Sequence, residues 1–592
     1  MTGLHRTLEE TTSLVQVAQG KTPADLYLRG GKVVNVYSGE VLSANVAVWG
    51  KRIAYVGALE SMVGPETQVL DAEGYYLLPG FIEPHGHSDY FFSAPELARA
   101  VLPGGTTAIF CDCLPTYSLL SLQDFGTFLE DMQRLPVKFF FGARAEPPSF
   151  WEPQRDELFT DESLAWWLDR PEILGMAEYT PWFRTLSDKT LVRKLQMVRE
   201  AGKRVEGHLA GCSYEKLNPM IDAGVTSCHE SINAEQALDR LRLGLWVILR
   251  ESSIRRDLKD LVRIVTENKV NTSRLMLTPD GPVPMSILQN GFVDYLVRLA
   301  ISYGVDPITA IQMATINPAT YLGLDQDLGG IAPGRIADIL MVRDLSEPRA
   351  EVVIANGKIA ARNGELIAQW PAPIWYKNAP NKFLDPSSPF RDIPPSLFRP
   401  PIKGAPDLFP VIELVNGVVT RRVDTPWRNQ GGYVAIDPAL GALRVSLIVW
   451  EKKQIISGYL TGMGARFGAL ASTLNVAKEL IVIGENEFDM SLAARTVVEM
   501  GGGICLAEGG RVLHKVAYSV AGLFPLAPLS ETAPVLAAIE DLLRERGFPH
   551  PSLYYSFHFL TNNHLVEIRM TVKGIWDVKK QQPLYEGQLV SE

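Results

Sequence analysis

Between residues 106 and 281, short apolar runs alternate with amphipathic segments of helical period. The runs read TTAIFCD, VKFFFGAR, ILGMAEY, RVEGHLAG, VTSCHES, LWVILRES and RLMLTPDG. Segments such as SLAWWLDR, TLVRKLQMVREAG, AEQALDRLRLG and LKDLVRIVTEN separate them. This alternation predicts βα units around a parallel sheet. With the preceding run PGFIEPHGH, at residues 79–87, the number of units approaches eight, which favours a barrel.

Two strand-rich stretches flank this region. Residues 24–78 contain DLYLRGGKVVNV and NVAVWGKRIAYVG, and residues 337–367 contain ADILMVRD and VVIANGKIAARNGELI. Their Gly-Gly and Gly-Lys turns between alternating runs indicate hairpins. We therefore expect residues 1–78 and 335–369 to build one composite β-sandwich domain around a barrel at 79–334.

A proline-rich stretch divides the rest of the chain. Residues 370–406 read WPAPIWYKNAPNKFLDPSSPFRDIPPSLFRPPIKGAP. Proline lacks the amide hydrogen that helices and inner strands need, so this stretch is predicted to be an ordered connector. Strand-like runs (LRVSLIVWE) and helix-like runs (APVLAAIEDLLRERG) mix from 407 to 592, which predicts a C-terminal α+β domain.

The bulk properties exclude several functional classes. The chain has 592 residues, 46% hydrophobic and 21% charged, with a formal net charge of −10. The negative charge disfavours nucleic acid as a partner. No uninterrupted apolar run reaches membrane-spanning length, and the polar N-terminus shows no secretory signal. Five cysteines in so long a chain suit a reducing compartment, so we expect a cytoplasmic protein.

The first apolar run ends in a His-x-His pair, His85 and His87. On an extended strand, residues i and i+2 point to the same face, so both imidazoles can reach one point in space. Imidazole is a common ligand of transition metals. The pair alone is a weak indication, and a metal site needs further ligands.

Those ligands occur where catalytic groups of a barrel lie, at the carboxyl ends of its strands. Successive runs end near Glu178, His208, His229 and Asp280. Singly, each residue has an ordinary structural explanation, such as a helix cap, a hydrogen-bonded core histidine or a turn. Together they predict a site for zinc, manganese or iron, because histidine with carboxylate suits such metals.

The order of these residues and the sequence motifs around them resemble those of the adenine deaminase family of the amidohydrolase superfamily, over nearly the whole chain. PGFIEPHGH is similar to the family's PGFID-x-H-x-H, and LPGGTTAIFCD to its P-x-GTTT-x-x-x-D. GHLAGCSYEKLNPMIDAGVTSCHES resembles its second histidine segment, which ends in His-Glu-Ser. AIQMATINPATYLGL and GGIAPGRIADILMVRDL resemble the barrel exit and the return to the β domain.

The resemblance implies an α/β fold with a metal-dependent (β/α)8 barrel and a hydrolytic deaminase activity. His85, His87, Glu178, His208 and His229 would hold two divalent metal ions, manganese or iron with zinc as a further option, and Glu178 would bridge them. Asp280 would be a further ligand and the catalytic proton shuttle, with Glu178 and Asp89 completing the catalytic set. For adenine, water attacks C6, and the products are hypoxanthine and ammonia.

The sequence departs from the family around the substrate. Asp89 replaces a glutamate, where it would bind a ring nitrogen or only support His87. Cys113 follows Asp112 in place of a His-Glu-containing segment. The family's His-Asp-Ser-His-Asn falls on residues 475–479, which read NVAKE. If that segment reaches the site, Lys478 and Glu479 should favour a substrate with an anionic or carbonyl-rich edge.

We expect the substrate-binding residues to be Asp89, Cys113, Arg144 and Trp182. The pair Cys111 and Cys113 is interpreted as apolar strand-end packing around Asp112 rather than as a metal motif.

Three functions remain open from the sequence. The first is adenine deamination, the second an amidohydrolase acting on another heterocycle or cyclic amide, and the third a non-catalytic, metal-stabilised protein. An intact Asp280 beside five ligand-type residues argues against the third. The expected partner is a small heterocyclic substrate, and by analogy with barrel enzymes of this size we expect a homo-oligomer.

Overall fold

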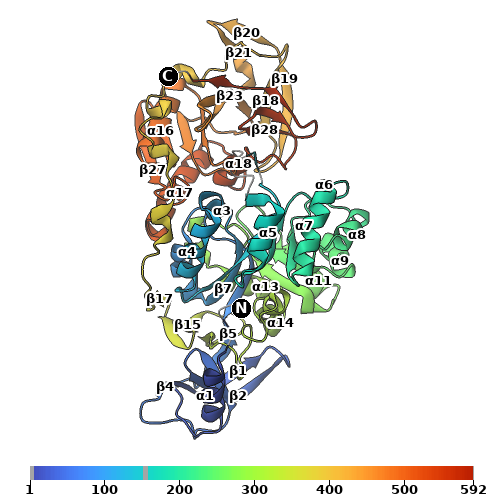
Figure 1. Cartoon of the computed structure of the whole chain (residues 1–592), viewed down its shortest axis with the longest axis vertical. Helices are drawn as coiled ribbons and strands as arrows, with labels where there is room; N and C mark the ends of the chain where they lie inside the picture. The colour runs from blue at the N-terminus through green and yellow to red at the C-terminus, as the bar shows by residue number, and fades with distance from the viewer. Residues whose placement is uncertain (1–3, 5, 148, 151–157, 591–592) are drawn as a thin grey trace.

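The computed structural model describes residues 4, 6–147, 149–150 and 158–590. Three bodies lie along the long axis of the molecule: a β domain at one end, a barrel in the middle and the C-terminal domain at the other end (Figure 1). The chain begins in the β domain, passes through the barrel and returns to the β domain. It then runs past the barrel into the C-terminal domain.

The central body is an eight-stranded parallel barrel. Its strands are β6 (Phe81–His87), β7 (Thr106–Asp112), β8 (Lys138–Ala143), β9 (Ile173–Tyr179), β10 (Arg204–Gly207), β11 (Ser227–Cys228), β12 (Trp246–Arg250) and β13 (Leu275–Thr278), paired in sequence order. The first and last strands meet through the Thr278 hydroxyl, which donates to the backbone carbonyl of His85 at 2.9 Å. The predicted (β/α)8 barrel is confirmed.

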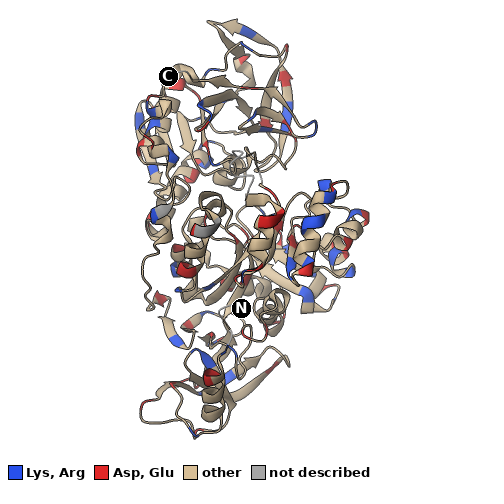
Figure 2. Cartoon of the chain, viewed as in Figure 1, with Lys and Arg blue, Asp and Glu red and all other residues tan. Residues whose placement is uncertain are grey.

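Helices cover the outside of the barrel. They include α2 (Ala94–Val101), α4 (Leu122–Met132), α5 (Asp161–Leu168), α7 (Lys189–Glu200), α8 (Tyr214–Asp222), α9 (Ala234–Arg242), α11 (Arg263–Thr266), α13 (Val293–Ser302), α14 (Pro307–Met313) and α15 (Ile316–Leu322). Helix α7 buries Leu191, Leu195 and Val198, which recur at the spacing of one helix face. Charged residues are frequent along α7, α8 and α9 (Figure 2).

The β domain is one nine-stranded sheet built from both flanking stretches. It contains β1 (Leu26–Asn35), β2 (Glu40–Trp49), β3 (Arg52–Gly57), β4 (Gln68–Asp71), β5 (Tyr76–Pro79), β14 (Ile339–Val342), β15 (Ala350–Ala355), β16 (Lys358–Arg362) and β17 (Glu365–Leu366). Ile53 of β3 and Ile354 of β15 share one apolar cluster, so the sheet folds over itself as the two layers of a sandwich would. Helix α1 (Leu8–Ala18) packs on this domain through Leu14 and Val17.

The proline-rich connector forms short 3-10 turns instead of regular elements: η4 (Trp375–Asn378), η5 (Lys382–Leu384), η6 (Pro389–Arg391) and η7 (Pro395–Phe398). Its start is fixed to the barrel, because the Asp131 carboxylate on α4 accepts the amides of Ile374 and Trp375 at 2.6 and 2.9 Å. Further on, Phe383 and Phe398 are fully buried against the C-terminal sheet.

The C-terminal domain is α+β. Its nine-stranded sheet contains β18 (Phe409–Leu414), β19 (Thr420–Thr425), β22 (Leu443–Val449), β23 (Gln454–Thr461), β24 (Ala469–Ser472), β25 (Leu480–Gly484), β26 (Gly503–Glu508), β27 (Arg511–Ala517) and β31 (Gln588–Leu589). A hairpin of β20 (Trp427–Gln430) and β21 (Tyr433–Ile436), and a small sheet of β28 (Ile568–Thr571), β29 (Gly574–Asp577) and β30 (Gln582–Tyr585), extend it.

Three helices complete the C-terminal domain: α16 (Glu487–Glu499), α17 (Leu529–Glu545) and α18 (Leu553–Phe559). Helix α18 lies between the C-terminal sheet and the barrel (Figure 1). Among the described helices, none combines the length and the apolar character that a membrane crossing requires. The predicted fold class is confirmed, while the exact domain boundaries stay predictions.

The connector should contribute measurably to stability. We predict that Phe383→Ala lowers the free energy of unfolding by about 3–5 kcal/mol, because the fully buried ring packs on Trp450 with centroids 5.1 Å apart. The neighbouring Leu384 is 47% exposed, so Leu384→Ala should change it by less than ~0.5 kcal/mol. Urea unfolding followed by tryptophan fluorescence compares the two variants, and equal stabilities would show that the connector does not pack as described.

Candidate metal centre

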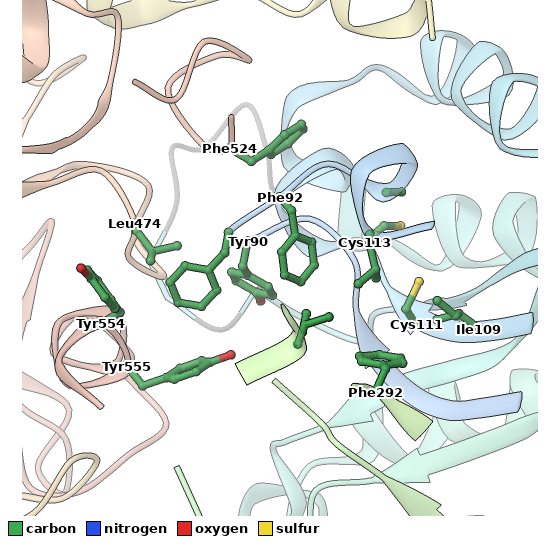
Figure 3. Packing of buried hydrophobic residues seen from close by; sticks show 14 of the residues in the cluster. Tyr90, Phe92, Ile109, Cys111, Cys113, Phe292, Leu474, Phe524, Tyr554 and Tyr555 are labelled. Atoms are coloured by element: carbon green, nitrogen blue, oxygen red, sulfur yellow. The ribbon is translucent and has the colours of Figure 1, made fainter. Parts of the chain in front are cut away.

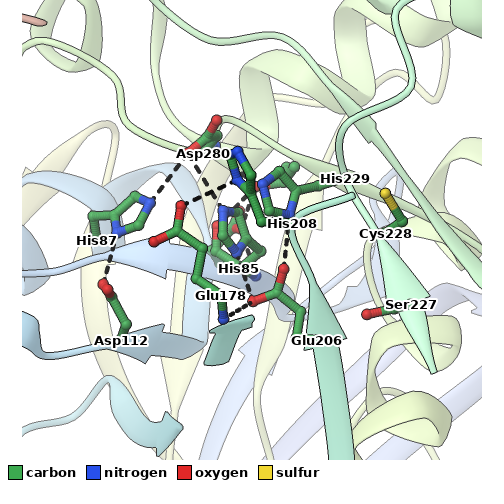
Figure 4. A network of polar contacts seen from close by, with 12 residues as sticks. His85, His87, Asp112, Glu178, Glu206, His208, Ser227, Cys228, His229 and Asp280 are labelled. Atoms are coloured by element: carbon green, nitrogen blue, oxygen red, sulfur yellow. Dashed lines mark hydrogen bonds and ion pairs between the residues drawn. The ribbon is translucent and has the colours of Figure 1, made fainter. Parts of the chain in front are cut away.

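The predicted ligand-type side chains meet at the carboxyl ends of the barrel strands (Figure 4). His85 and His87 end β6, Glu178 lies near the end of β9, and His208, His229 and Asp280 follow β10, β11 and β13. Two groups form. One joins His85, His87 and Asp280, and the other joins Glu178, His208 and His229, with one ligand atom of each residue within 4.8 Å of the others.

Asp280 lies between the two imidazoles of β6. Its Oδ1 is 3.4 Å from His85 Nε2 and 3.2 Å from His87 Nε2. In the other group, His208 Nδ1 is 3.4 Å from Glu178 Oε1. His85 Nε2 and His208 Nδ1 are both buried, and neither has a hydrogen-bond partner within the part of the chain that the structure describes. Buried polar atoms are normally satisfied, so these two nitrogens fit ligands of a divalent transition metal.

A carboxylate that the sequence analysis missed supports two of the histidines. Glu206, fully buried on β10, accepts hydrogen bonds from His85 Nδ1 at 2.9 Å and from His229 Nδ1 at 2.7 Å. The two imidazoles stack with their centroids 3.9 Å apart. Because Nδ1 of each ring carries the proton toward Glu206, Nε2 is left as the metal-binding atom. Glu206 precedes His208, which directly follows β10, by two residues, a spacing that could have indicated a shared face.

The protonation of Glu206 follows from the same contacts. Burial alone would raise the pKa of its carboxyl group, but the His85 and His229 imidazoles outweigh burial and hold the pKa below its usual value. Glu206 is therefore an ionised acceptor for both rings.

His87 receives a separate support. Its Nδ1 lies 2.6 Å from Asp112 Oδ1 at the end of β7. Arg144, which follows β8, pairs with Asp112 and lies 2.8 Å from Glu178 Oε2. Arg144 is 4% exposed. The Arg144 guanidinium is thus engaged by two carboxylates of the site, and its role in substrate binding stays a prediction.

A second arginine orients Asp280. Arg250, the last residue of β12, places Nη1 3.1 Å from Asp280 Oδ2 and also pairs with Glu230. Burial would raise the pKa of Asp280, but the close imidazoles of His85 and His87 and the charge of Arg250 lower it well below its usual value. Asp280 therefore presents one oxygen to the histidines and the other to Arg250.

Glu178 and Asp280 share an unusual backbone conformation. Their φ angles are +44° and +56°, in the left-handed region that residues other than glycine seldom occupy. Each is held by a hydrogen bond from its own amide: Glu178 donates to Glu206 Oε2 at 3.1 Å, and Asp280 donates to Thr278 Oγ1 at 2.8 Å. Such strained residues concentrate at functional sites.

The two carboxylate oxygens of Asp89 have different surroundings. Its Oδ2 accepts the Thr116 amide at 2.9 Å and so caps α3 (Leu114–Leu119), whereas its buried Oδ1 has no partner among the described residues. Burial, with a smaller effect of the Asp112 charge, raises the pKa of Asp89 to about 7. The expected support of His87 comes from Asp112, which leaves substrate binding as the open role for Asp89.

The two other predicted substrate-binding residues lie in different surroundings. Cys113 is buried with Cys111 in the apolar cluster beside Tyr90 and Phe92 (Figure 3). No cysteine joins a candidate metal group in the described ranges, in agreement with the packing interpretation. Trp182, at the start of α6 (Trp182–Thr185), places its ring under the Lys216 ammonium of α8, 5.7 Å from the centroid.

Within the C-terminal segment 475–479, Lys478 contacts the barrel, whereas Glu479 points into its own domain. Lys478 reaches the barrel by donating to the carbonyl of Leu114 at 3.0 Å. Glu479 turns the other way and pairs with Lys382 at 2.6 Å while accepting the Trp450 amide at 3.0 Å. The expectation that Glu479 faces the substrate is therefore wrong, because its carboxylate satisfies a buried amide of its own domain.

Comparison with known proteins agrees with this architecture. Residues 76–360 match the model of the amidohydrolase family, and residues 417–582 match that of the adenine deaminase C-terminal domain. The chain is 35% identical to the adenine deaminase of Moorella thermoacetica, with 96% of each chain covered. It is 31% identical to that of Kosmotoga olearia, covering 95% of this chain and 97% of the relative. With that of Clostridium botulinum (strain Loch Maree / Type A3) the identity is 33%, over 97% and 96%.

Glu206 offers a direct test of how the histidines are held. We predict that Glu206→Gln weakens metal binding by roughly 10–100-fold, because the two imidazoles bind different oxygens of Glu206 and one of these positions becomes an NH2 donor. The exposed Glu215 of α8 provides a matched control, and Glu215→Gln should bind metal as the unchanged protein does. Competition of the folded variants with a chromogenic chelator measures the affinity. Equal affinities for Glu206→Gln and the unchanged protein would remove Glu206 from the metal centre.

Proposed function

The chain belongs to the adenine deaminase family, and from this premise we propose that it hydrolyses adenine to hypoxanthine and ammonia. The observation that carries the proposal is the position of Asp280, a buried, ionised carboxylate between the imidazoles of His85 and His87. This is the arrangement that a proton-transferring group needs beside a hydrolytic metal site.

We propose that two divalent ions, manganese or iron with zinc as the further option, are bound by the two histidine groups. Glu178 belongs to the group of His208 and His229 and also to a group with His87 and Asp112, so it is the residue best placed to be shared between two ions. When bound, such ions lower the pKa of a water molecule toward neutrality and so supply the nucleophile.

The side chains of the chain then have separate tasks. Asp280 would accept a proton from the attacking water through Oδ1 and pass it to the leaving nitrogen, while Arg250 fixes its orientation through Oδ2. Asp89 offers the unpartnered Oδ1 to a ring nitrogen of the substrate. Since burial raises the pKa of Asp89 to about 7, this group can act as a donor or an acceptor near neutral pH.

A hydrolase of another heterocycle or cyclic amide is the alternative. It is favoured by the contacts of the 475–479 segment, in which Glu479 is turned away and Lys478 is bound to a barrel carbonyl. The non-catalytic alternative is disfavoured by the left-handed backbone of Glu178 and Asp280, a strain that a purely structural ion does not require.

The cysteines bear on the compartment in which the enzyme works. All five cysteines are free and buried, which suits a reducing compartment, and we propose the cytoplasm. A homo-oligomer is proposed by analogy with barrel enzymes of this size.

Loading with metal should control the activity. We predict that the protein treated with a chelator releases no ammonia from adenine, and that added manganese or ferrous ions restore kcat/KM to about 10⁴ M⁻¹s⁻¹ or more. The control is zinc-loaded protein assayed in parallel. Activity of the loaded protein on pterins, aminopyrimidines or cyclic ureas, with none on adenine, would favour the alternative substrate class.

Asp280 should be needed for turnover more than for folding. Asp280→Asn is expected to lower kcat by roughly 10²-fold or more, because an amide cannot transfer the proton. Elemental analysis should still find metal, since the histidines and Glu178 are unchanged. The exposed Asp222→Asn on α8 serves as the control. A variant of Asp280 that keeps near-normal kcat would contradict the assigned role.

A further inference from the structure

Helix α18 of the C-terminal domain turns two polar aromatic side chains toward the barrel. Tyr555 and His558 are three residues apart and so lie on one face of the helix. They are 7% and 6% exposed. Figure 3 shows Tyr555 near Tyr90, with its hydroxyl directed to the barrel side. No role was assigned to this helix on the basis of the sequence.

The Tyr90 ring lies between His558 and His87 of the metal centre. The His558 imidazole meets Tyr90 edge to face with centroids 4.9 Å apart, and Tyr90 meets His87 in the same way at 5.4 Å. His558 lines a cavity between the two domains together with Tyr90, Leu114, Asn475 and Lys478.

One nitrogen of this imidazole is unsatisfied. His558 Nδ1 is buried and has no hydrogen-bond partner among the residues that the structure describes. A buried unpaired polar atom is energetically costly, so packing alone does not account for a histidine here. The cavity measures about 10 Å³, so a water molecule or one polar atom of a ligand that reaches it would supply the missing partner.

Tyr555 approaches the catalytic loop itself. Its hydroxyl lies against Gly281, the residue after Asp280, so closely that a Cβ atom at Gly281 would overlap it. The tyrosine ring is held from behind by Phe91, with centroids 5.6 Å apart, and by Phe559 at 5.9 Å. The hydroxyl is therefore held beside the residue that we assign to proton transfer.

The segment that replaces the family's histidine motif explains how α18 is kept in place. The Val476 amide donates to the carbonyl of His558 at 3.3 Å, and the Ala477 amide donates to Thr561 Oγ1 at 3.0 Å. Residues 476 and 477 thus hold the end of α18 through their backbone, without contributing a titratable side chain.

We propose that α18 is the recognition helix of the site, in which His558 hydrogen-bonds the edge of a neutral nitrogen heterocycle and the Tyr555 hydroxyl binds the substrate next to Asp280. This inference deepens the proposed function and rests on it. A neutral imidazole has one donor and one acceptor, which matches the alternating donors and acceptors of a purine edge. Burial lowers the pKa of His558 to about 3, so the ring is neutral at physiological pH.

The test uses the full-length, manganese-loaded protein and hypoxanthine, the expected product, as a probe that is not turned over. We expect His558→Phe to raise the Kd of hypoxanthine and the KM of adenine by roughly 10–100-fold with unchanged metal content, because a site built for a hydrogen bond loses affinity when it is removed. His558→Asn keeps a polar atom near the position of Nδ1 and should retain most of the affinity. Tyr555→Phe should lower kcat/KM about tenfold. His514→Phe, on the edge strand β27, is the control.

The outcomes separate this inference from the proposed function. Unchanged Kd and KM for both His558→Phe and Tyr555→Phe would overturn the recognition role while adenine turnover stands. If the unchanged protein neither binds hypoxanthine nor turns over adenine, the proposed substrate fails. The same variants are then compared on whichever pterin or aminopyrimidine the unchanged protein binds. Loss of that binding in His558→Phe supports the inference, and failure of every ring to bind overturns it.

Discussion

The Glu206 carboxylate, shared by the imidazoles of His85 and His229, is the contact on which the site depends. It joins β6, β10 and β11, and through the Glu178 amide it also joins β9. One side chain thus fixes the tautomer of two metal-ligand candidates and the strained backbone of a third. In a parallel barrel the strand ends converge, so a single central carboxylate can reach partners that lie far apart in the sequence.

The remaining charges are arranged around this centre in a largely buried network. Carboxylates outnumber guanidinium groups: the five carboxylates of Asp112, Glu178, Glu206, Glu230 and Asp280 face the guanidinium groups of Arg144, Arg250 and Arg255. Burying unbalanced negative charge is costly. Protonated histidines would offset part of the excess, and divalent cations would offset it without occupying the ring nitrogens with protons. The excess negative charge and the unpartnered imidazole nitrogens therefore both favour divalent cations at this site.

The sequence predicted the parts that depend on local pattern. Alternating apolar runs defined the barrel, and their last residues identified His85, His87, Glu178, His208, His229 and Asp280, which the structure brings together. Contacts between side chains on different strands could not be predicted from local pattern. Glu206 is 121 residues from His85, and Arg144 could be placed near the site but not assigned to Asp112 and Glu178. The direction of the Glu479 side chain was misjudged, and the role of Trp182 stays open. The direction of a side chain in a loop or a short helix follows no periodic pattern.

The role of helix α18 could not be predicted from the sequence for a related reason. Its seven residues are too few to show a period, and its aromatic composition is equally compatible with a buried strand. Only the folded chain shows that it lies beside Tyr90, whose neighbours in the sequence are the metal-ligand candidates.

The apolar cluster at the barrel mouth also has a consequence for the synthesis of the chain. Phe91 is covered by Tyr554 and Tyr555, about 460 residues later in the sequence. The last barrel strand ends at Thr278, 277 residues before Tyr555, so at ~5–20 residues per second the finished barrel waits on the order of a quarter of a minute to a minute for its cover. Until then its aromatic rim is open to water and to other chains. A helix that is made long after the barrel is thus the part that closes this aromatic surface.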